Sequence, residues 1–159
     1  MTDESTPRKK RPLPPVKEAA VAYLSRRDHA EKELRQKLKR RGYSHGDIEQ
    51  AIDFCQDYKW LDDVRYAGTT IRNGIAKGWG ELRIRQEMEL KGVNSQVIEQ
   101  VMAVHEIDWF EHARAVAQRK YGETPMETQK EKAKRFRFMQ SRGFDFEQIA
   151  YAFDQDEEY

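Results

Sequence analysis

Apolar residues recur with the same spacing in three stretches of the sequence, and each stretch is built around a glycine. The stretches are LKRRGYSHGDIEQAI at 38–52, MELKGVNSQVIEQVM at 88–102 and MQSRGFDFEQIAYAF at 139–153. Their glycines, Gly42, Gly92 and Gly143, lie 50 and 51 residues apart. Apolar residues stand four positions before each glycine and six, nine and ten positions after it. These intervals are typical of amphipathic helices, so the chain carries one helical unit three times.

Each glycine is expected to end one helix shortly before another begins. The residue just past a helix often adopts a left-handed conformation that favours glycine. The residue before each glycine is basic, as the negative end of the helix dipole favours: Arg41, Lys91 and Arg142. Two positions after each glycine stands a side chain that can cap the next helix: Ser44, Asn94 and Asp145.

A further helical stretch precedes each unit, at residues 19–27, 64–73 and 109–121, so each module has three helices. No stretch alternates with the period of two that is typical of a strand. We predict an all-α fold of three tandem three-helix modules, at 16–61, 62–108 and 109–159, in an elongated, curved arrangement. Residues 1–15 hold four of the five prolines and a basic cluster, which predicts a flexible basic arm.

The charged residues are sorted by helix. They form 36% of the 159-residue chain, yet the net charge is only +1, so a partner must be bound through local patches. The middle helix of each module is basic, with eight basic and three acidic residues between Arg26 and Arg41, whereas the third helices are acidic. Two interpretations are open. Equivalent basic helices could form a stripe that binds a partner, or the charges could pair between neighbouring helices.

The residue types that carry enzyme chemistry are present but not in useful patterns. Ser44, His45 and Asp47 are better explained as a helix start than as a catalytic triad. The four histidines lack the spacing of metal ligands, and Cys55 falls at an apolar helical position, where burial is expected. Trp79, between two glycines, is predicted to be exposed for contact. We expect neither an enzyme nor a cofactor or metal site.

The start of the chain lacks the apolar core of a secretory signal, and no apolar run is long enough to span a membrane. A cytoplasmic protein that does not bind membranes is therefore expected.

Two longer runs resemble hallmark segments of the RecX regulatory proteins of bacteria. They are YLSRRDHAEKELRQKLKRRGY at 23–43 and WLDDVRYAGTTIRNGIAKGWGELRIRQEMELKGV at 60–93, and RFMQSRGF at 137–144 also fits the family pattern. The resemblance covers about residues 17–153. It implies a non-enzymatic inhibitor of the RecA recombinase, which lies in the helical groove of the RecA filament on single-stranded DNA. Such a protein lowers ATP hydrolysis, strand exchange and co-protease activity.

The expected partner is therefore the RecA filament, with weak binding to single-stranded DNA, and the chain is expected to be a monomer. The alternative is a helical module that binds single-stranded DNA directly, because arginine-rich helices with nearby aromatic residues also suit that ligand. In either case the predicted contact residues are arginines of the basic stripe: Arg26, Arg27, Arg35, Arg40, Arg41, Arg72, Arg83, Arg85 and Arg135.

Overall fold

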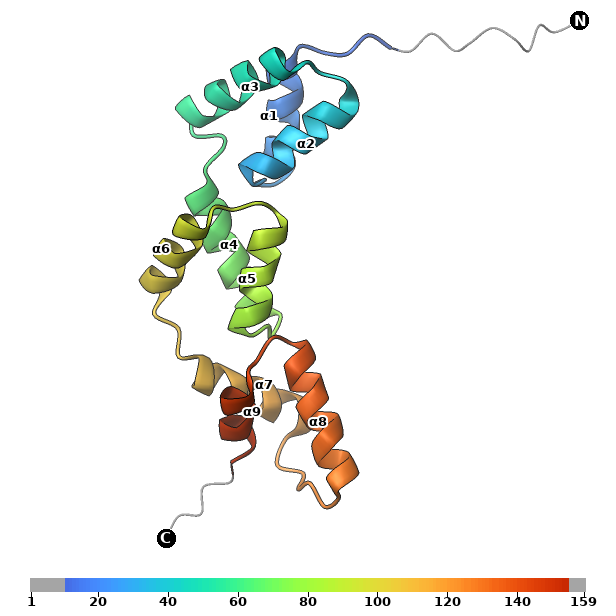
Figure 1. The fold of residues 1–159 in the computed structure, drawn as a ribbon, viewed down its shortest axis with the longest axis vertical. Helices are drawn as coiled ribbons and strands as arrows, with labels where there is room; N and C mark the ends of the chain where they lie inside the picture. Colours follow the sequence, from blue (N-terminus) through green and yellow to red (C-terminus); the bar gives the residue numbers. More distant parts are fainter. Residues whose placement is uncertain (1–10, 155–159) are drawn as a thin grey trace, which may run out of the picture. The chain divides into compact units, whose positions relative to one another are not determined.

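The computed structural model describes residues 11–154, which form nine α-helices and no strand (Figure 1). The helices are α1 (Val16–Arg26), α2 (Glu31–Arg41), α3 (His45–Asp57), α4 (Asp63–Ala76), α5 (Glu81–Leu90), α6 (Ser95–His105), α7 (Trp109–Tyr121), α8 (Gln129–Ser141) and α9 (Phe146–Phe153). The prediction of an all-α fold with three helices in each of three tandem modules is confirmed. The elongated, curved arrangement stays a prediction. Most of the predicted arm, residues 1–10, lies outside the described residues, as do residues 155–159.

The turn between the second and third helix of each module follows the predicted chemistry. The three repeat glycines, Gly42, Gly92 and Gly143, have φ angles of 105°, 81° and 97°. The three predicted caps accept hydrogen bonds from backbone amides at the start of the following helix: Ser44 from Asp47 at 3.2 Å, Asn94 from Gln96 at 2.8 Å and Asp145 from Gln148 at 2.8 Å. The prediction that one helix ends at each glycine and the next begins shortly after it is confirmed in all three modules.

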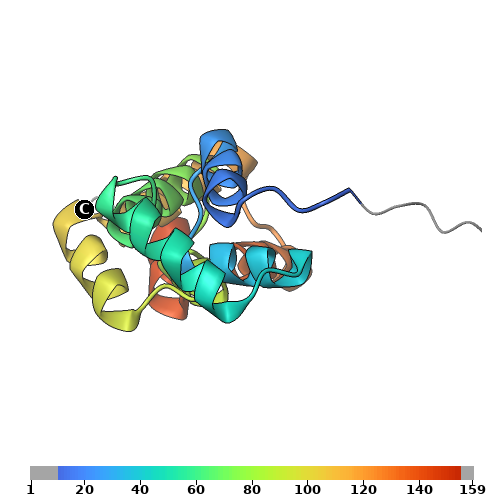
Figure 2. The same ribbon diagram turned by 90° about the horizontal axis from the view of Figure 1, so that it is seen from above.

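Residues 11–29 and 33–61 form one compact unit, in which α1 packs against α3 (Figure 2). Its core is formed by the apolar faces of α1, α2 and α3, and Leu34, Leu38, Ile52 and Cys55 are all 0% exposed. The predicted burial of Cys55 is confirmed. Burial raises the pKa of its thiol, which disfavours the reactive thiolate.

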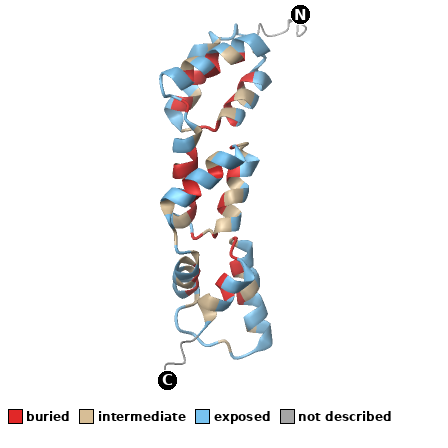
Figure 3. Ribbon diagram, turned by 60° about the vertical axis from the view of Figure 1, so that its left-hand side comes forward, coloured by how far each residue is buried: buried red, intermediate tan, exposed pale blue. Residues whose placement is uncertain are grey.

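Residues 30–32 and 62–154 form the second unit, which contains two apolar cores. One core lies among α4, α5 and α6 and includes Ile71, Ile84 and Met88. The other lies among α7, α8 and α9 and includes Met139 and Ile149. In Figure 3 the buried residues lie on the sides of the helices that face one another within each group of three.

Within this second unit, the end of α8 meets the start of α5. The Gly80 amide donates to the Arg142 carbonyl at 2.7 Å, and the Leu82 amide donates to the Gly143 carbonyl at 3.1 Å. A Cβ on Gly143 would lie 2.5 Å from the Cβ of Arg83 and 2.6 Å from its amide nitrogen. Gly143 is therefore required for close packing as well as for its backbone conformation.

The other two repeat glycines differ in this respect. A Cβ on Gly92 would lie 2.7 Å from the Cβ of Lys32, also a residue of the second unit. A Cβ on Gly42 would meet only the Cδ1 of Leu13, at 3.7 Å, which is an ordinary contact. The sequence predicted the helix end at each glycine but not the close approach at two of them.

Candidate functional site: the predicted arginine surface

Three of the nine predicted arginines are exposed at helix ends in the first unit. Arg26 is the last residue of α1, and Arg40 and Arg41 are the last two residues of α2. Within residues 11–154, none of the three contacts a carboxylate. The guanidinium carbon of Arg41 lies 5.7 Å from the ring centroid of Tyr23 and 6.0 Å from that of Tyr43. Such rings hold a guanidinium group in place without neutralising its charge, so these arginines are available to a partner.

Arg27 is held by a nearly buried carboxylate. Its Nη1 and Nη2 donate to the two carboxylate oxygens of Glu33 at 3.1 and 2.8 Å, and Glu33 is only 8% exposed. A buried carboxylate without a partner would cost several kcal/mol, roughly 3–5. Arg27 therefore stabilises the first unit.

His29 lies beside this pair and is 3% exposed. Its Nδ1 is 3.0 Å from the Arg27 carbonyl oxygen, and its Nε2 is 2.8 Å from Lys37 Nζ. A lysine ammonium only donates, so Nε2 accepts, Nδ1 donates and the imidazole is neutral. Burial lowers the pKa of His29 and favours this neutral form, as do the charges of Arg27 and Lys37.

Arg35 and Arg85 stand seven positions before their repeat glycines and pair with glutamates seven positions after them. Arg35 Nη2 donates to Glu49 at 3.2 Å, and Arg85 Nη2 donates to Glu99 at 3.4 Å; in each pair Nη1 contacts the other carboxylate oxygen. These hydrogen bonds lower the pKa of Glu49 and of Glu99. Arg85 also donates through Nε to Glu81 at 3.1 Å. At these two positions the charges pair between neighbouring helices.

Arg83 lies over the ring of Trp79, 4.3 Å from its centroid, and Lys77 Nζ lies 4.9 Å from the same centroid. The Trp79 ring is half-buried and packs against the α4–α6 core. A Cβ on Gly74 would lie 2.6 Å from Ile84 Cγ1 and 3.4 Å from the Trp79 ring, so this glycine lets Ile84 approach α4 beside the ring. The predicted exposure of Trp79 is therefore wrong. Its carbonyl oxygen lies 2.9 Å from His112 Nε2, a side chain whose pKa is lowered by burial.

Two further predicted contacts differ strongly in exposure. Arg72 on α4 is exposed, and its Nη2 donates to the Thr69 hydroxyl at 3.1 Å. Arg135 on α8 is only 4% exposed. Its Nε donates to Glu131 at 3.0 Å and its Nη1 to the Thr124 carbonyl at 2.9 Å. A partner would reach this guanidinium only if these contacts opened.

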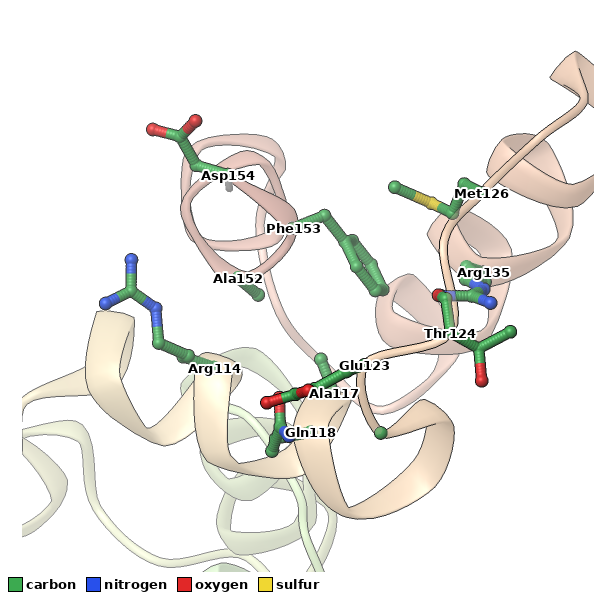
Figure 4. A pocket seen from close by; sticks show the side chains of 11 residues that line it. Arg114, Ala117, Gln118, Glu123, Thr124, Met126, Arg135, Ala152, Phe153 and Asp154 are labelled. Carbon is green, nitrogen blue, oxygen red and sulfur yellow. The ribbon is translucent and has the colours of Figure 1, made fainter. Parts of the chain in front are cut away.

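Arg135 also borders a pocket of about 440 Å³ among α7, the 122–128 loop, α8 and α9 (Figure 4). Arg114 and Arg135 lie on opposite sides of this pocket, and Glu123 and Asp154 also line it. Charged residues of both signs therefore line the pocket, and they favour neither an anionic nor a cationic ligand.

Some exposed side chains were missed by the sequence reasoning. Leu82 and Phe146 are 56% and 70% exposed, although both are large and apolar. Phe146 stands three positions after its glycine, where the other two modules have His45 and Ser95. The exposure of Phe146 could have been predicted from the sequence, because the equivalent position is polar in the other two modules. Arg137 on α8 is exposed and has no carboxylate partner in the described part of the chain.

The described residues contain no group of three side chains that could hold a metal ion. No helix in residues 11–154 is both long and apolar enough to cross a bilayer.

Models of the three RecX three-helix domains match the chain in order. The first domain matches residues 17–55, the second residues 62–102 and the third residues 106–153. The chain belongs to the RecX family. The RecX domains fall on the three helix groups described above, and the family consists of regulatory proteins rather than enzymes.

Curated relatives and solved structures agree with this assignment. The chain is 50% identical over 141 residues to the regulatory protein RecX of Vibrio vulnificus, covering 89% of this chain and 92% of that protein. It is 36% identical over 146 residues to the regulatory protein RecX of Halorhodospira halophila, covering 90% and 91%. The crystal structure of RecX from Lactobacillus salivarius has the same fold, with a TM-score of 0.71 at 20% identity, covering 86% of this chain and 91% of that one.

Proposed function

We propose that this RecX protein binds the RecA filament on single-stranded DNA and inhibits its ATP hydrolysis, strand exchange and co-protease activity. The observation that carries the proposal is RecX family membership across all three modules. In this proposal the protein acts as a monomer in the cytoplasm, where RecA filaments form on DNA, and it needs no cofactor.

Three modules of one kind in a single chain support binding to a polymeric partner. A filament repeats the same surface at each subunit, so similar modules can make several weak contacts together. Linked contacts raise the overall affinity through effective concentration. Exposed cations at the ends of α1 and α2 give the first module a basic surface for such a contact.

We assign the direct contacts to Arg26, Arg40 and Arg41, together with Arg72 and Arg83. These five do not pair with carboxylates within residues 11–154, so their charge is available to a partner. Of the remaining four, Arg27, Arg35 and Arg85 act mainly by holding neighbouring helices together through their ion pairs. Arg135 pairs with Glu131 within α8 and holds that helix to the 122–128 loop through the Thr124 carbonyl.

The direct test is hydrolysis of ATP by RecA on single-stranded DNA. Substoichiometric amounts of the protein should slow hydrolysis, and a comparison of preformed with growing filaments should separate loosening of the groove from capping of the ends. Unchanged hydrolysis at a severalfold molar excess, in low salt, contradicts the proposal.

A charge reversal tests the assigned surface. The double variant Arg40→Glu/Arg41→Glu should inhibit about tenfold more weakly, because two attractive contacts become repulsive. The matched control is Arg119→Glu/Lys120→Glu, which makes the same charge change at an exposed basic pair in the last turn of α7. Circular dichroism should show equal helicity for both variants. Equal inhibition by both would show that the end of α2 does not face RecA.

Direct binding to single-stranded DNA is the second candidate. Four exposed cations on α8 favour it: Lys130, Lys132, Lys134 and Arg137. With a net charge of only +1, we expect modest affinity. Tight binding to naked DNA that falls steeply with salt, as counterion release requires, would favour this candidate over the filament.

A further inference from the structure

A groove of about 740 Å³ lies between the start of α5 and the turn that joins α8 to α9, all within the second unit. The α5 wall is formed by Leu82, Arg83 and Gln86, and the facing wall includes Gln140 and Phe146. The groove exists because the end of α8 abuts the start of α5 through the contact of Gly143 with Arg83. None of the family comparisons assigns a role to it.

Two exposed apolar side chains line the groove. Leu82 is 56% exposed and Phe146 is 70% exposed. Single exposed apolar residues are common on protein surfaces, but these two border the same hollow, where a partner side chain can contact both. The Phe136 ring packs against Phe146 at 5.5 Å, which orients the Phe146 ring from one side. The groove therefore offers apolar walls to a bulky apolar side chain.

The polar groups of the groove have an excess of free donors. The carbonyl oxygens of Arg142 and Gly143 already accept from the α5 amides, so the negative end of α8 is satisfied. Asp145, the one carboxylate that lines the groove, is engaged as the cap of α9 and accepts from the Gln148 amide at 2.8 Å. Arg83 contributes only a long contact of 3.5 Å, from Nη1 to the Ser141 carbonyl, so most of its donors remain open.

The Asp145 carboxylate already compensates the positive end of α9, which begins at Phe146. The Arg83 guanidinium is therefore the charged group of the groove that is left to favour a carboxylate. Gln86 and Gln140 are exposed, and their amides have no hydrogen-bond partner among residues 11–154. Side-chain amides both donate and accept, which matches the backbone groups of an extended peptide.

We infer that this groove binds a protein segment with a bulky apolar side chain next to a carboxylate. The apolar side chain lies between Leu82 and Phe146, and the carboxylate faces Arg83. In the context of the proposed function, on which this step rests, the segment belongs to a RecA subunit of the filament.

The first experiment does not involve RecA. A synthetic peptide with a central Leu-Trp pair between glutamates is titrated into the full-length protein, and amide signals are followed by NMR. The signals of Leu82, Gln86, Gln140 and Phe146 should shift, whereas the same peptide with lysines in place of glutamates should leave them unchanged. No shift with the acidic peptide, or equal shifts with both peptides, overturns the inference. Shifts caused by a single-stranded oligonucleotide but not by the peptide overturn it as well, in favour of a nucleic-acid surface.

The second experiment measures binding to RecA filaments. The double variant Leu82→Ala/Phe146→Ala should bind at least tenfold more weakly, as is typical when anchoring apolar side chains are removed from an interface. The matched control is Leu90→Ala/Val104→Ala, since both of these side chains are 74% exposed and lie outside the groove. All four positions are exposed, so both variants should keep the fold, and circular dichroism checks this because Phe146→Ala removes the contact with the Phe136 ring.

The two experiments separate the two proposals. Wild-type affinity in the groove variant, with wild-type helicity, overturns the groove as the site for RecA. If the wild-type protein itself does not bind filaments, the proposed function fails, and the peptide titration alone decides whether the groove binds acidic, apolar segments.

Discussion

The middle helix packs against its neighbours through different residue types in the first two modules and in the third. Eight positions before the repeat glycine, the first two modules have Leu34 and Ile84, which are both 0% exposed. The third module has Arg135 there, and it is also buried. One position later, the first two modules have the arginines that pair with glutamates, whereas the third has Phe136.

In the third module, the apolar residue and the arginine at these two neighbouring positions have thus changed places. Phe136 takes the place of the pairing arginine, and its partner across the helices is the ring of Phe146. Arg135 takes the place of a core aliphatic residue, and it is accommodated because Glu131, the Thr124 carbonyl and the Tyr121 ring all contact its guanidinium group. The same helical unit therefore accepts a buried charge only where the preceding loop and helix supply partners for it.

The largest effect on stability is expected from substitutions of the repeat glycines. Its size should differ between the third module and the first. Gly143→Ala should lower the free energy of unfolding by about 3 kcal/mol, since strain at positive φ costs roughly 1–2 kcal/mol and overpacking against Arg83 roughly 1–3 kcal/mol. Gly42→Ala carries only the strain and should cost about 1 kcal/mol. Urea denaturation of the two variants measures the difference. Equal costs would mean that the close approach at Gly143 relaxes without penalty.

The next effect concerns the buried arginine. Arg135→Ala should lower the free energy of unfolding by about 2–3 kcal/mol, because it leaves a cavity and removes the partner of the Thr124 carbonyl. Arg135→Leu, which restores the residue type of the first two modules, should cost clearly less, since a well-packed apolar residue often replaces a buried charge without loss. If the leucine variant is as unstable as the alanine variant, the third module needs the charge itself.

The repeat alignment explains how much of the fold and of the arginine surface could be predicted from the sequence. Spacing alone gave the helices, the caps and the positive φ angles, because these depend on neighbours within a few positions. Applying the same register to Arg135 would also have predicted its burial, since it aligns with Leu34 and Ile84. Treating every arginine of a basic helix as a surface residue obscured that signal.

Other features depend on contacts between distant parts of the chain. The approach of Arg83 to Gly143 joins residues 60 positions apart, and no local pattern encodes it. The groove between α5 and the α8–α9 turn follows from that approach. Its exposed walls were hidden in the sequence because Leu82 and Phe146 resemble core residues by type.

The smallest effect is expected from the ion pairs that distinguish the first two modules. A double-mutant cycle of Arg35→Ala and Glu49→Ala should give a favourable coupling at neutral pH, because the two side chains make paired hydrogen bonds across α2 and α3. Added salt should weaken this coupling, since both side chains are partly exposed to solvent.

The same cycle should also depend on pH. Hydrogen bonding to Arg35 holds the pKa of Glu49 below its ordinary value of 4.5, so the unfolded chain takes up this proton more readily than the folded protein. The stabilisation is therefore complete above pH 4.5 and is lost as the pH falls through the lowered pKa. A matched cycle of Phe136→Ala and Phe146→Ala in the third module should give a coupling that neither salt nor pH alters, because no charge is involved. A salt-dependent coupling between the two phenylalanines, or a salt-independent one between Arg35 and Glu49, would remove the distinction between the modules.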